Sequence, residues 1–185
     1  MRLDITLPVT PEMRRSAPEK DDRTLVGHLG THFDVMDKEF PLDYTCRAGI
    51  VFDVSAIRGR DIDLGDIHMD RVEKGQFVAF YTGYIEEESY GTKTYFSEHP
   101  QLSHDLIDAL LDKEIAIIGI DCSGIRRGKE HTPKDQLCAD RGVFVVENLR
   151  GLQALVSAGG RFTAHTYPVS YTGMTGLPCR VIAEI

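Results

Sequence analysis

The seven residues from His28 to Asp34, His-Leu-Gly-Thr-His-Phe-Asp, place the tightest limit on how this chain can fold. His28, His32 and Asp34 are separated by even numbers of residues, so all three side chains point to one face of an extended strand. An α-helix would align the two histidines but would turn the aspartate about 240° away from His28. Gly30 adds no side chain and leaves space above the strand. We therefore expect an extended segment with two imidazoles and a carboxylate on one side.

Two imidazoles and one carboxylate that converge on one point suit Zn²⁺ or Mn²⁺ and leave a position open for water. The alternative is that two histidines stand four residues apart by chance and serve as hydrogen-bonded core residues. Three ligand-type side chains with a spacing glycine are less easily accidental than one buried histidine. The segment therefore favours a metal site.

The rest of the chain predicts a mixed α/β sheet with few packed helices, formed by one domain over residues 1–185. Short stretches rich in β-branched and aromatic residues predict strands over residues 48–54, 77–82, 115–121, 143–146, 162–169 and 179–185. Helical spacing of apolar residues predicts one helix over residues 104–113, capped by Ser103, and another from residue 148 to Gly159. Three polar stretches, residues 8–23, 85–93 and 123–135, are expected to form loops.

Charge and cysteine content exclude several classes of protein. The net charge is −8, and a field of that sign repels phosphate backbones, so nucleic acid is not an expected partner. The longest apolar run is five residues, far below the roughly 20 that a membrane helix needs. The chain begins without an apolar stretch typical of a signal peptide, and its four cysteines form no C-x-x-C pair. We expect a cytoplasmic protein with reduced thiols and no membrane association.

The segment from His28 to Asp34 resembles the His-x-Gly-Thr-His-x-Asp motif of the cyclase family of metal-dependent hydrolases. That family includes bacterial kynurenine formamidases (arylformamidases) and isatin hydrolases. Further blocks resemble the family in the same order: Asp4-Ile5-Thr6, Thr82-Gly83-Tyr84, Tyr95-Phe96, His99 to Ser103, Gly119-Ile120-Asp121, Val146 to Leu149 and Pro178 to Ala183. The resemblance covers nearly the whole chain. It implies a swivelling β/β/α fold that is usually assembled as a homodimer or homotetramer.

The resemblance also implies a set of metal ligands. By this resemblance His28, His32 and Asp34 bind a first divalent ion, with Zn²⁺ expected before Mn²⁺, and Asp34 bridges to a second ion. Glu147 matches the glutamate of the family's second site. The alternative for Glu147 is a carboxylate that interacts favourably with the dipole of a helix N-terminus.

One expected ligand of the second site departs from the family. The family's second-site histidine lies twelve residues before its glutamate, and here that position holds Asp135. Asp135 can ligate a divalent cation through oxygen. His131, four residues earlier, is the alternative ligand, and it is equally consistent with an exposed loop histidine.

Lys38 is the second departure, because it occupies the position of the family's presumed general-base histidine. Burial beside metal ions would lower the pKa of Lys38 and make it a base. A charged Lys38 would instead hold a substrate carboxylate or stabilise an oxyanion. The third alternative is a solvated lysine, since Asp37, Lys38 and Glu39 form a run of charges.

The resemblance implies a hydrolase that activates water on a metal ion and cleaves an amide of a small molecule. N-formylkynurenine, an intermediate of tryptophan catabolism, is the family's best-known substrate, so an arylformamidase is the first expectation. One alternative is a hydrolase of isatin-like or other cyclic amides. The other is a metal- or ligand-binding protein with a decayed catalytic site, which Lys38 and Asp135 favour.

Overall fold

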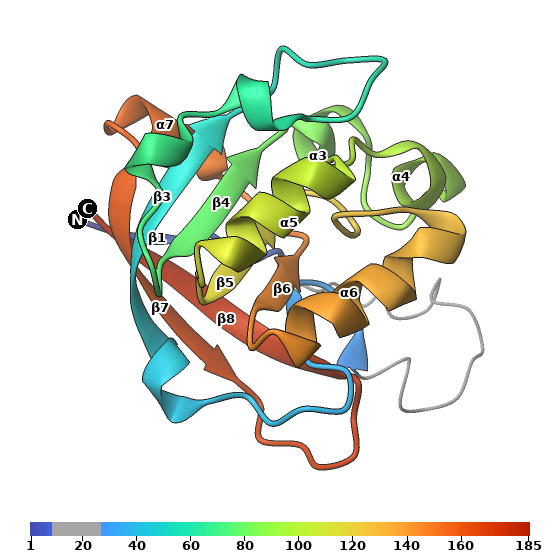
Figure 1. Ribbon diagram of the computed structural model, residues 1–185, viewed down its shortest axis with the longest axis vertical. Helices are drawn as coiled ribbons and strands as arrows, with labels where there is room; N and C mark the ends of the chain where they lie inside the picture. The colour runs from blue at the N-terminus through green and yellow to red at the C-terminus, as the bar shows by residue number, and fades with distance from the viewer. Residues whose placement is uncertain (9–26) are drawn as a thin grey trace.

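The chain folds around one strongly curved sheet with helices packed on its outer face, while a further helix (Leu152–Ser157) packs into the core on the other side (Figure 1). The computed structural model describes residues 1–8 and 27–185. The strands are β1 (Arg2–Asp4), β2 (His32–Asp34), β3 (Cys46–Asp53), β4 (Phe77–Tyr81), β5 (Ile117–Ile120), β6 (Phe144–Glu147), β7 (Arg161–Pro168) and β8 (Gly176–Glu184). The α-helices are α3 (Tyr84–Glu87), α4 (Lys93–Glu98), α5 (His104–Asp112), α6 (His131–Asp140) and α7 (Leu152–Ser157).

The strand order is β1-β8-β2-β6-β5-β4-β3-β7, and an additional pairing of β7 with β8 closes the sheet. Strands β3 to β6 run parallel to one another. Strand β2 is antiparallel to both of its neighbours, β6 and β8. The expected mixed α/β fold with few helices is therefore confirmed.

The parallel strands are buried on both faces, which explains why their sequences are apolar runs rather than alternating patterns. In β4, Val78 and Phe80 face a core that also contains the apolar side of α5. Phe77 and Ala79 face a second core on the other side of the sheet. Both faces of the sheet thus exclude water around the strands that lead to the functional residues.

Helix α5 confirms the expectation for residues 104–113 almost residue for residue. The Ser103 hydroxyl oxygen accepts a hydrogen bond from the Leu106 backbone N–H at 3.1 Å, which caps the first turn. The buried residues of the helix are Leu106, Ile107, Leu110 and Leu111. Their spacing places one apolar stripe against the sheet.

The expected loop over residues 123–135 is wrong at its end, because α6 begins at His131. This helix has no continuous apolar stripe, so hydrophobic periodicity does not reveal it. Pro133 stands in its first turn, where the missing backbone N–H has no helical partner to lose. Among its buried residues is Asp135, which the helix turns toward the sheet end near β6.

The other boundaries shift for local reasons. Residues 85–93 include most of α3 and the first residue of α4, so they are not one loop. The helix expected from residue 148 begins only at Leu152, because Asn148 and Gly151 adopt positive φ angles of 57° and 71°. The expected loop over residues 8–23 lies, apart from Pro8, outside the described residues.

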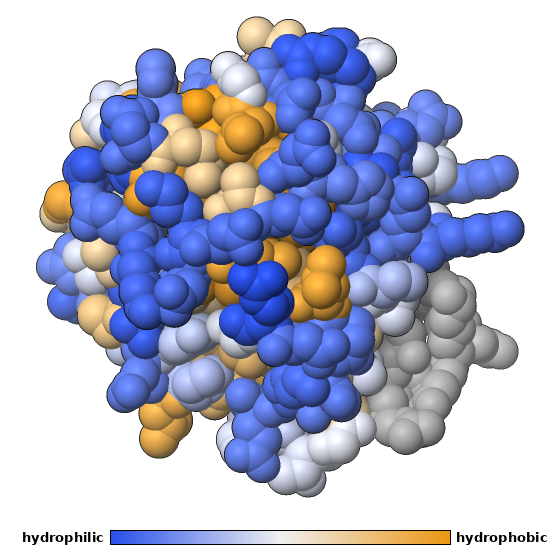
Figure 2. Space-filling view, viewed as in Figure 1, coloured by the Kyte–Doolittle hydropathy of each residue, from blue (hydrophilic) through white to orange (hydrophobic). Residues whose placement is uncertain are grey.

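The face that carries α5 and α6 is mostly hydrophilic, with apolar side chains gathered in small groups (Figure 2). No helix formed by residues 1–8 and 27–185 has the length and apolar character to span a membrane.

Candidate metal centre

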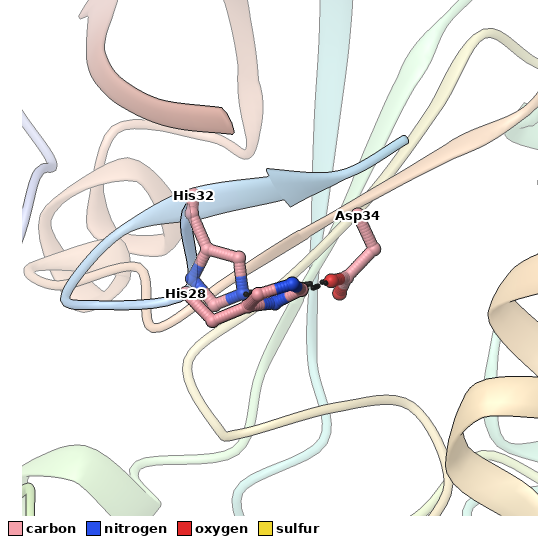
Figure 3. Close-up of side chains that lie close together, drawn as sticks. All are labelled: His28, His32 and Asp34. Carbon is pink, nitrogen blue, oxygen red and sulfur yellow. Dashed lines mark hydrogen bonds and ion pairs between the residues drawn. The ribbon is translucent and has the colours of Figure 1, made fainter. Parts of the chain in front are cut away.

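His28, His32 and Asp34 meet on one face of β2 (Figure 3). His28 Nδ1 lies 3.1 Å from both His32 Nε2 and Asp34 Oδ1, and His32 Nε2 lies 3.6 Å from Asp34 Oδ1. Donors bound tetrahedrally at about 2.1 Å from one ion would stand roughly 3.4 Å apart, so the three separations suit one ion. We refer to these three residues as the first group.

The first group forms by a different route from the one expected. Strand β2 spans only His32 to Asp34, and His28 lies in a bend before it. Gly30 has a φ angle of 72°, a left-handed conformation that turns the chain back on itself. The expectation of a strand reaching His28 is therefore wrong, although the three side chains do converge.

A second group consists of Asp34, His131, Asp135 and Glu147, whose donor atoms all lie within 4.8 Å of one another. His131 Nε2 is 3.4 Å from Asp135 Oδ2 and 3.7 Å from Glu147 Oε1. Glu147 stands opposite His32 in the β2–β6 pairing, and its Oε2 is 3.6 Å from His32 Nε2. The structure thus brings His131 and Asp135 to the site together, where the sequence offered them as alternatives. Asp34 belongs to both groups.

Each of the three histidines turns its second ring nitrogen to an oxygen outside the two groups. The pairs are His28 Nε2 with Thr175 Oγ1 at 2.9 Å, His32 Nδ1 with the Gly30 carbonyl at 2.9 Å, and His131 Nδ1 with the Arg126 carbonyl at 3.1 Å. A carbonyl oxygen can only accept, so Nδ1 of His32 and of His131 carries the proton. Their Nε2 atoms face the cluster, and in the neutral form of each ring this nitrogen presents a lone pair there, as metal-binding histidines do.

Three buried carboxylate oxygens in the cluster, Asp34 Oδ2, Asp135 Oδ1 and Glu147 Oε1, have no hydrogen-bond partner among residues 1–8 and 27–185. Burial and the charge of Asp34 raise the pKa values of Asp135 and Glu147. Burial also acts on Asp34, but the charge of His32 and hydrogen bonds from both histidines outweigh it and hold the pKa of Asp34 well below its usual range. Unpaired buried oxygens of this kind are what a divalent cation would satisfy.

Two glycines make room for the histidines. A Cβ atom at Gly176 would stand 2.7 Å from His28 Nε2, and one at Gly124 would stand 2.5 Å from His131 Nδ1. Both distances are too short for a side chain. The sequence gives no signal for these roles. Gly176 lies far along the chain from His28, and Gly124 lies outside the helix that carries His131.

The Gly30 peptide is held by side chains that the sequence analysis also missed. The Asn148 side-chain amide donates to the Gly30 carbonyl at 2.9 Å, and the Tyr95 hydroxyl donates to Asn148 Oδ1 at 2.8 Å. The Gly30 N–H donates to the Tyr90 hydroxyl oxygen at 2.9 Å. Because the same carbonyl orients His32, this network fixes the orientation of a candidate ligand.

Of the three alternatives for Lys38, the structure favours the solvated lysine in a run of charges. Strand β2 ends at Asp34, and a turn with Met36 at φ 56° redirects the chain, so Lys38 does not share the strand face of the first group. Its ammonium group lies 2.8 Å from Asp140 Oδ1 and 3.1 Å from Asp37 Oδ1. Hydrogen bonds to these carboxylates raise the pKa of Lys38 rather than lower it. A neutral lysine base is not supported by this environment.

A protein-family model named Cyclase matches residues 3–126, about two thirds of the chain. The chain belongs to the cyclase family. The matched stretch contains all of the first group and ends before His131, so the placement of the rest of the second group comes from the structure. No curated protein matches the sequence.

Solved structures share the fold along nearly the entire chain. One, described as a "predicted metal-dependent hydrolase" from Bacillus stearothermophilus, has a TM-score of 0.76 at 25% identity and covers 99% of this chain and 97% of its own. Isatin hydrolase A from Ralstonia solanacearum has a TM-score of 0.77 at 16% identity, covering 99% and 91%. Isatin hydrolase A from Labrenzia aggregata, bound to benzyl benzoate, has a TM-score of 0.75 at 17% identity, covering 99% and 93%. The family and the fold expected from the sequence are thus confirmed.

Proposed function

We propose that this cyclase-family protein is a metal-dependent hydrolase of a small-molecule amide, with an arylformamidase-like substrate such as N-formylkynurenine. The observation that carries the proposal is the cluster of three histidines with fixed ring nitrogens and three buried carboxylates with unpaired oxygens. This donor set suits one or two divalent ions, with Zn²⁺ or Mn²⁺ as the candidates. The family membership supports hydrolysis as the reaction class.

A divalent ion bound here would lower the pKa of a coordinated water and polarise the substrate carbonyl. The chain's own residues would do the rest. His28, His32 and Asp34 hold their donor atoms on one side, and hydrogen bonds behind the two histidine rings fix those rings. Asp135 Oδ1 has no partner among the described residues and is a further oxygen available to hold a divalent ion. Burial of the Asp34 and Asp135 carboxylates excludes bulk water from the reacting groups.

The proposal is tested with purified protein reconstituted with Zn²⁺ or Mn²⁺ and assayed by absorbance on N-formylkynurenine and on isatin. We expect hydrolysis of the formamide, loss of turnover with a chelator, and loss of turnover in His32→Ala. His68→Ala is the matched control, because His68 is exposed and lies outside both groups. Its rate should equal that of the unchanged protein.

The outcomes separate the alternatives. Turnover of isatin without turnover of the formamide would move the proposal to cyclic amides, which the isatin hydrolase relatives make the second candidate. Metal binding without turnover of either substrate would contradict the hydrolase proposal and favour a binding protein with a decayed site.

We also propose that copies of the chain associate in the cytoplasm. Leu42, Tyr167, Val169 and Tyr171 are exposed apolar residues at the rim of one cavity of about 610 Å³. An exposed apolar group of this kind often marks a contact between proteins. All four cysteines are free thiols, which suits a reducing compartment. Light scattering should give a dimer or tetramer, and Tyr167→Glu should weaken it. A monomer at micromolar concentration would contradict this proposal.

A further inference from the structure

The two groups of the cluster are chemically unlike. The first group offers two imidazole nitrogens and one carboxylate, from His28, His32 and Asp34. The second group offers one imidazole nitrogen, from His131, and three carboxylates. The difference arises chiefly at Asp135, which occupies the position where the family resemblance leads us to expect a histidine.

Donor chemistry separates the metals that such groups prefer. Imidazole suits Zn²⁺ and later transition metals, whereas carboxylate oxygens suit Mg²⁺, Ca²⁺ and Mn²⁺. We propose that the cluster takes two different metals, Zn²⁺ in the first group and the harder Mn²⁺ in the second, and that Asp135 sets the choice in the second. The inference rests on the proposed function only in requiring that both groups bind metal.

The surroundings of Asp135 show that its carboxylate is not used by the fold. Its side chain is 2% exposed, although it lies on a helix whose sequence is mostly polar. Asp135 Oδ1 has no hydrogen-bond partner among residues 1–8 and 27–185. The nearest basic group to its other oxygen is His131 Nε2 at 3.4 Å, and the His131 ring is already fixed through its opposite nitrogen. A buried carboxylate with one unpaired oxygen is costly unless a cation satisfies it.

Glu147 and Asp34 add two further carboxylates on the same side. Glu147 reaches the second group with Oε1 and faces His32 of the first group with Oε2. Both Asp34 Oδ2 and Glu147 Oε1 are buried and unpaired among the described residues. Three acidic side chains against one histidine therefore give the second group a stronger negative charge than the first, which favours a hard cation over a softer one.

The test uses the full chain, stripped of metal and loaded with one equivalent of Zn²⁺. Mn²⁺ is then titrated in, and the free aqueous Mn²⁺ is followed by its electron paramagnetic resonance signal. A parallel titration with a second equivalent of Zn²⁺ gives the ratio of the two affinities at the remaining group. We expect one equivalent of Mn²⁺ to bind while the first Zn²⁺ stays in place.

Asp135→His converts the second group to two nitrogens and two carboxylates. Because metal sites change affinity by about 10–100-fold when their ligand environment is altered, we expect this variant to shift the Mn²⁺-to-Zn²⁺ affinity ratio toward Zn²⁺ by about tenfold or more. Asp140→His is the matched control, since Asp140 is on the same helix but exposed and outside the cluster. Its ratio should not change. If Asp135→His does not fold, Asp135→Asn removes the charge with little change of shape and should lose Mn²⁺ uptake.

Three results would overturn the inference. They are a Zn²⁺-loaded protein that takes up no Mn²⁺, an unchanged affinity ratio in Asp135→His, and retained Mn²⁺ uptake in Asp135→Asn. None of these measurements involves a substrate. A protein that binds both metals as expected but hydrolyses nothing would contradict the proposed function and leave this inference standing.

Discussion

Replacing Gly176 with alanine should damage the first group without altering any candidate ligand. Gly176 is in β8, opposite Asp34 in the β2–β8 pairing. The added Cβ would stand 2.6 Å from the Gly27 carbonyl oxygen and 2.7 Å from His28 Nε2, where ordinary contact begins at 3.4 Å. The His28 ring or the strand would therefore have to move by about 0.7 Å, against a tolerance of about 0.2 Å for metal–donor distances.

The expected result is weaker metal binding at the first group. Disturbing residues that orient metal ligands typically lowers affinity by about 10–100-fold, which corresponds to about 1.4–2.7 kcal/mol. The affinity for Zn²⁺ is measured by competition with a chromophoric chelator, and circular dichroism checks that the fold is kept. Gly65→Ala is the matched control, because nothing lies within 4 Å of a Cβ at that position.

A Gly176→Ala protein that keeps its fold and binds Zn²⁺ as tightly as the unchanged protein would refute this reasoning. The same refutation would follow if Gly65→Ala weakened binding equally. Thr175→Val offers an independent check, since it removes the 2.9 Å partner of His28 Nε2 without adding a clash. It should weaken Zn²⁺ binding in the same direction.

Three further variants test other parts of the structure. Burial lowers the pKa of His99 from 6.5 to about 4, so the unfolded state binds more protons between these values. The free energy of unfolding should therefore fall as pH falls through this window, by about 3 kcal/mol in total for this residue. Denaturation curves of His99→Gln should lack that part of the pH dependence, and an unchanged curve would argue against a buried neutral imidazole. Asn148→Ala removes the donor to the Gly30 carbonyl and the acceptor for Tyr95, and should cost about 1–3 kcal/mol of unfolding free energy. Chelator competition should also show weaker metal binding, whereas unchanged metal affinity would limit Asn148 to a structural role. Lys38→Met should leave metal content, kcat and KM on a confirmed substrate unchanged, and abolished turnover would restore Lys38 as the base.

The local parts of this structure could be predicted from the sequence, and the parts that depend on distant contacts could not. The run from Phe77 to Tyr81 predicts a doubly buried strand, and Ser103 with its apolar stripe predicts α5. Helix α6 carries no such stripe, since it buries Asp135 instead of a row of apolar residues. Propensity and periodicity therefore could not distinguish it from a loop.

In the candidate site, too, the features set by local sequence could be predicted and those set by distant contacts could not. The spacing of His28, His32 and Asp34 predicts that they converge. A bend at Gly30, and not a continuous strand, brings His28 to the other two. Lys38 would share the face of the first group only if the strand continued four residues past Asp34, and the turn at Met36 ends that alternation. The roles of Gly124 and Gly176 depend on tertiary packing and have no local signal.

The position of β2 in the sheet has a consequence for the order of folding. This strand of three residues lies between β6 and β8, which follow it in the chain by more than 100 residues. During synthesis from the N-terminus, the segment with His28, His32 and Asp34 therefore has no strand neighbour until β6 has emerged, and it lacks its second neighbour until β8 has emerged. Loop closure over such separations is slow, because its entropy cost precedes the contacts that offset it. A nascent chain that stops before β8 should leave β2 unpaired along one edge, so we expect tight metal capture only after the last strand has closed the sheet.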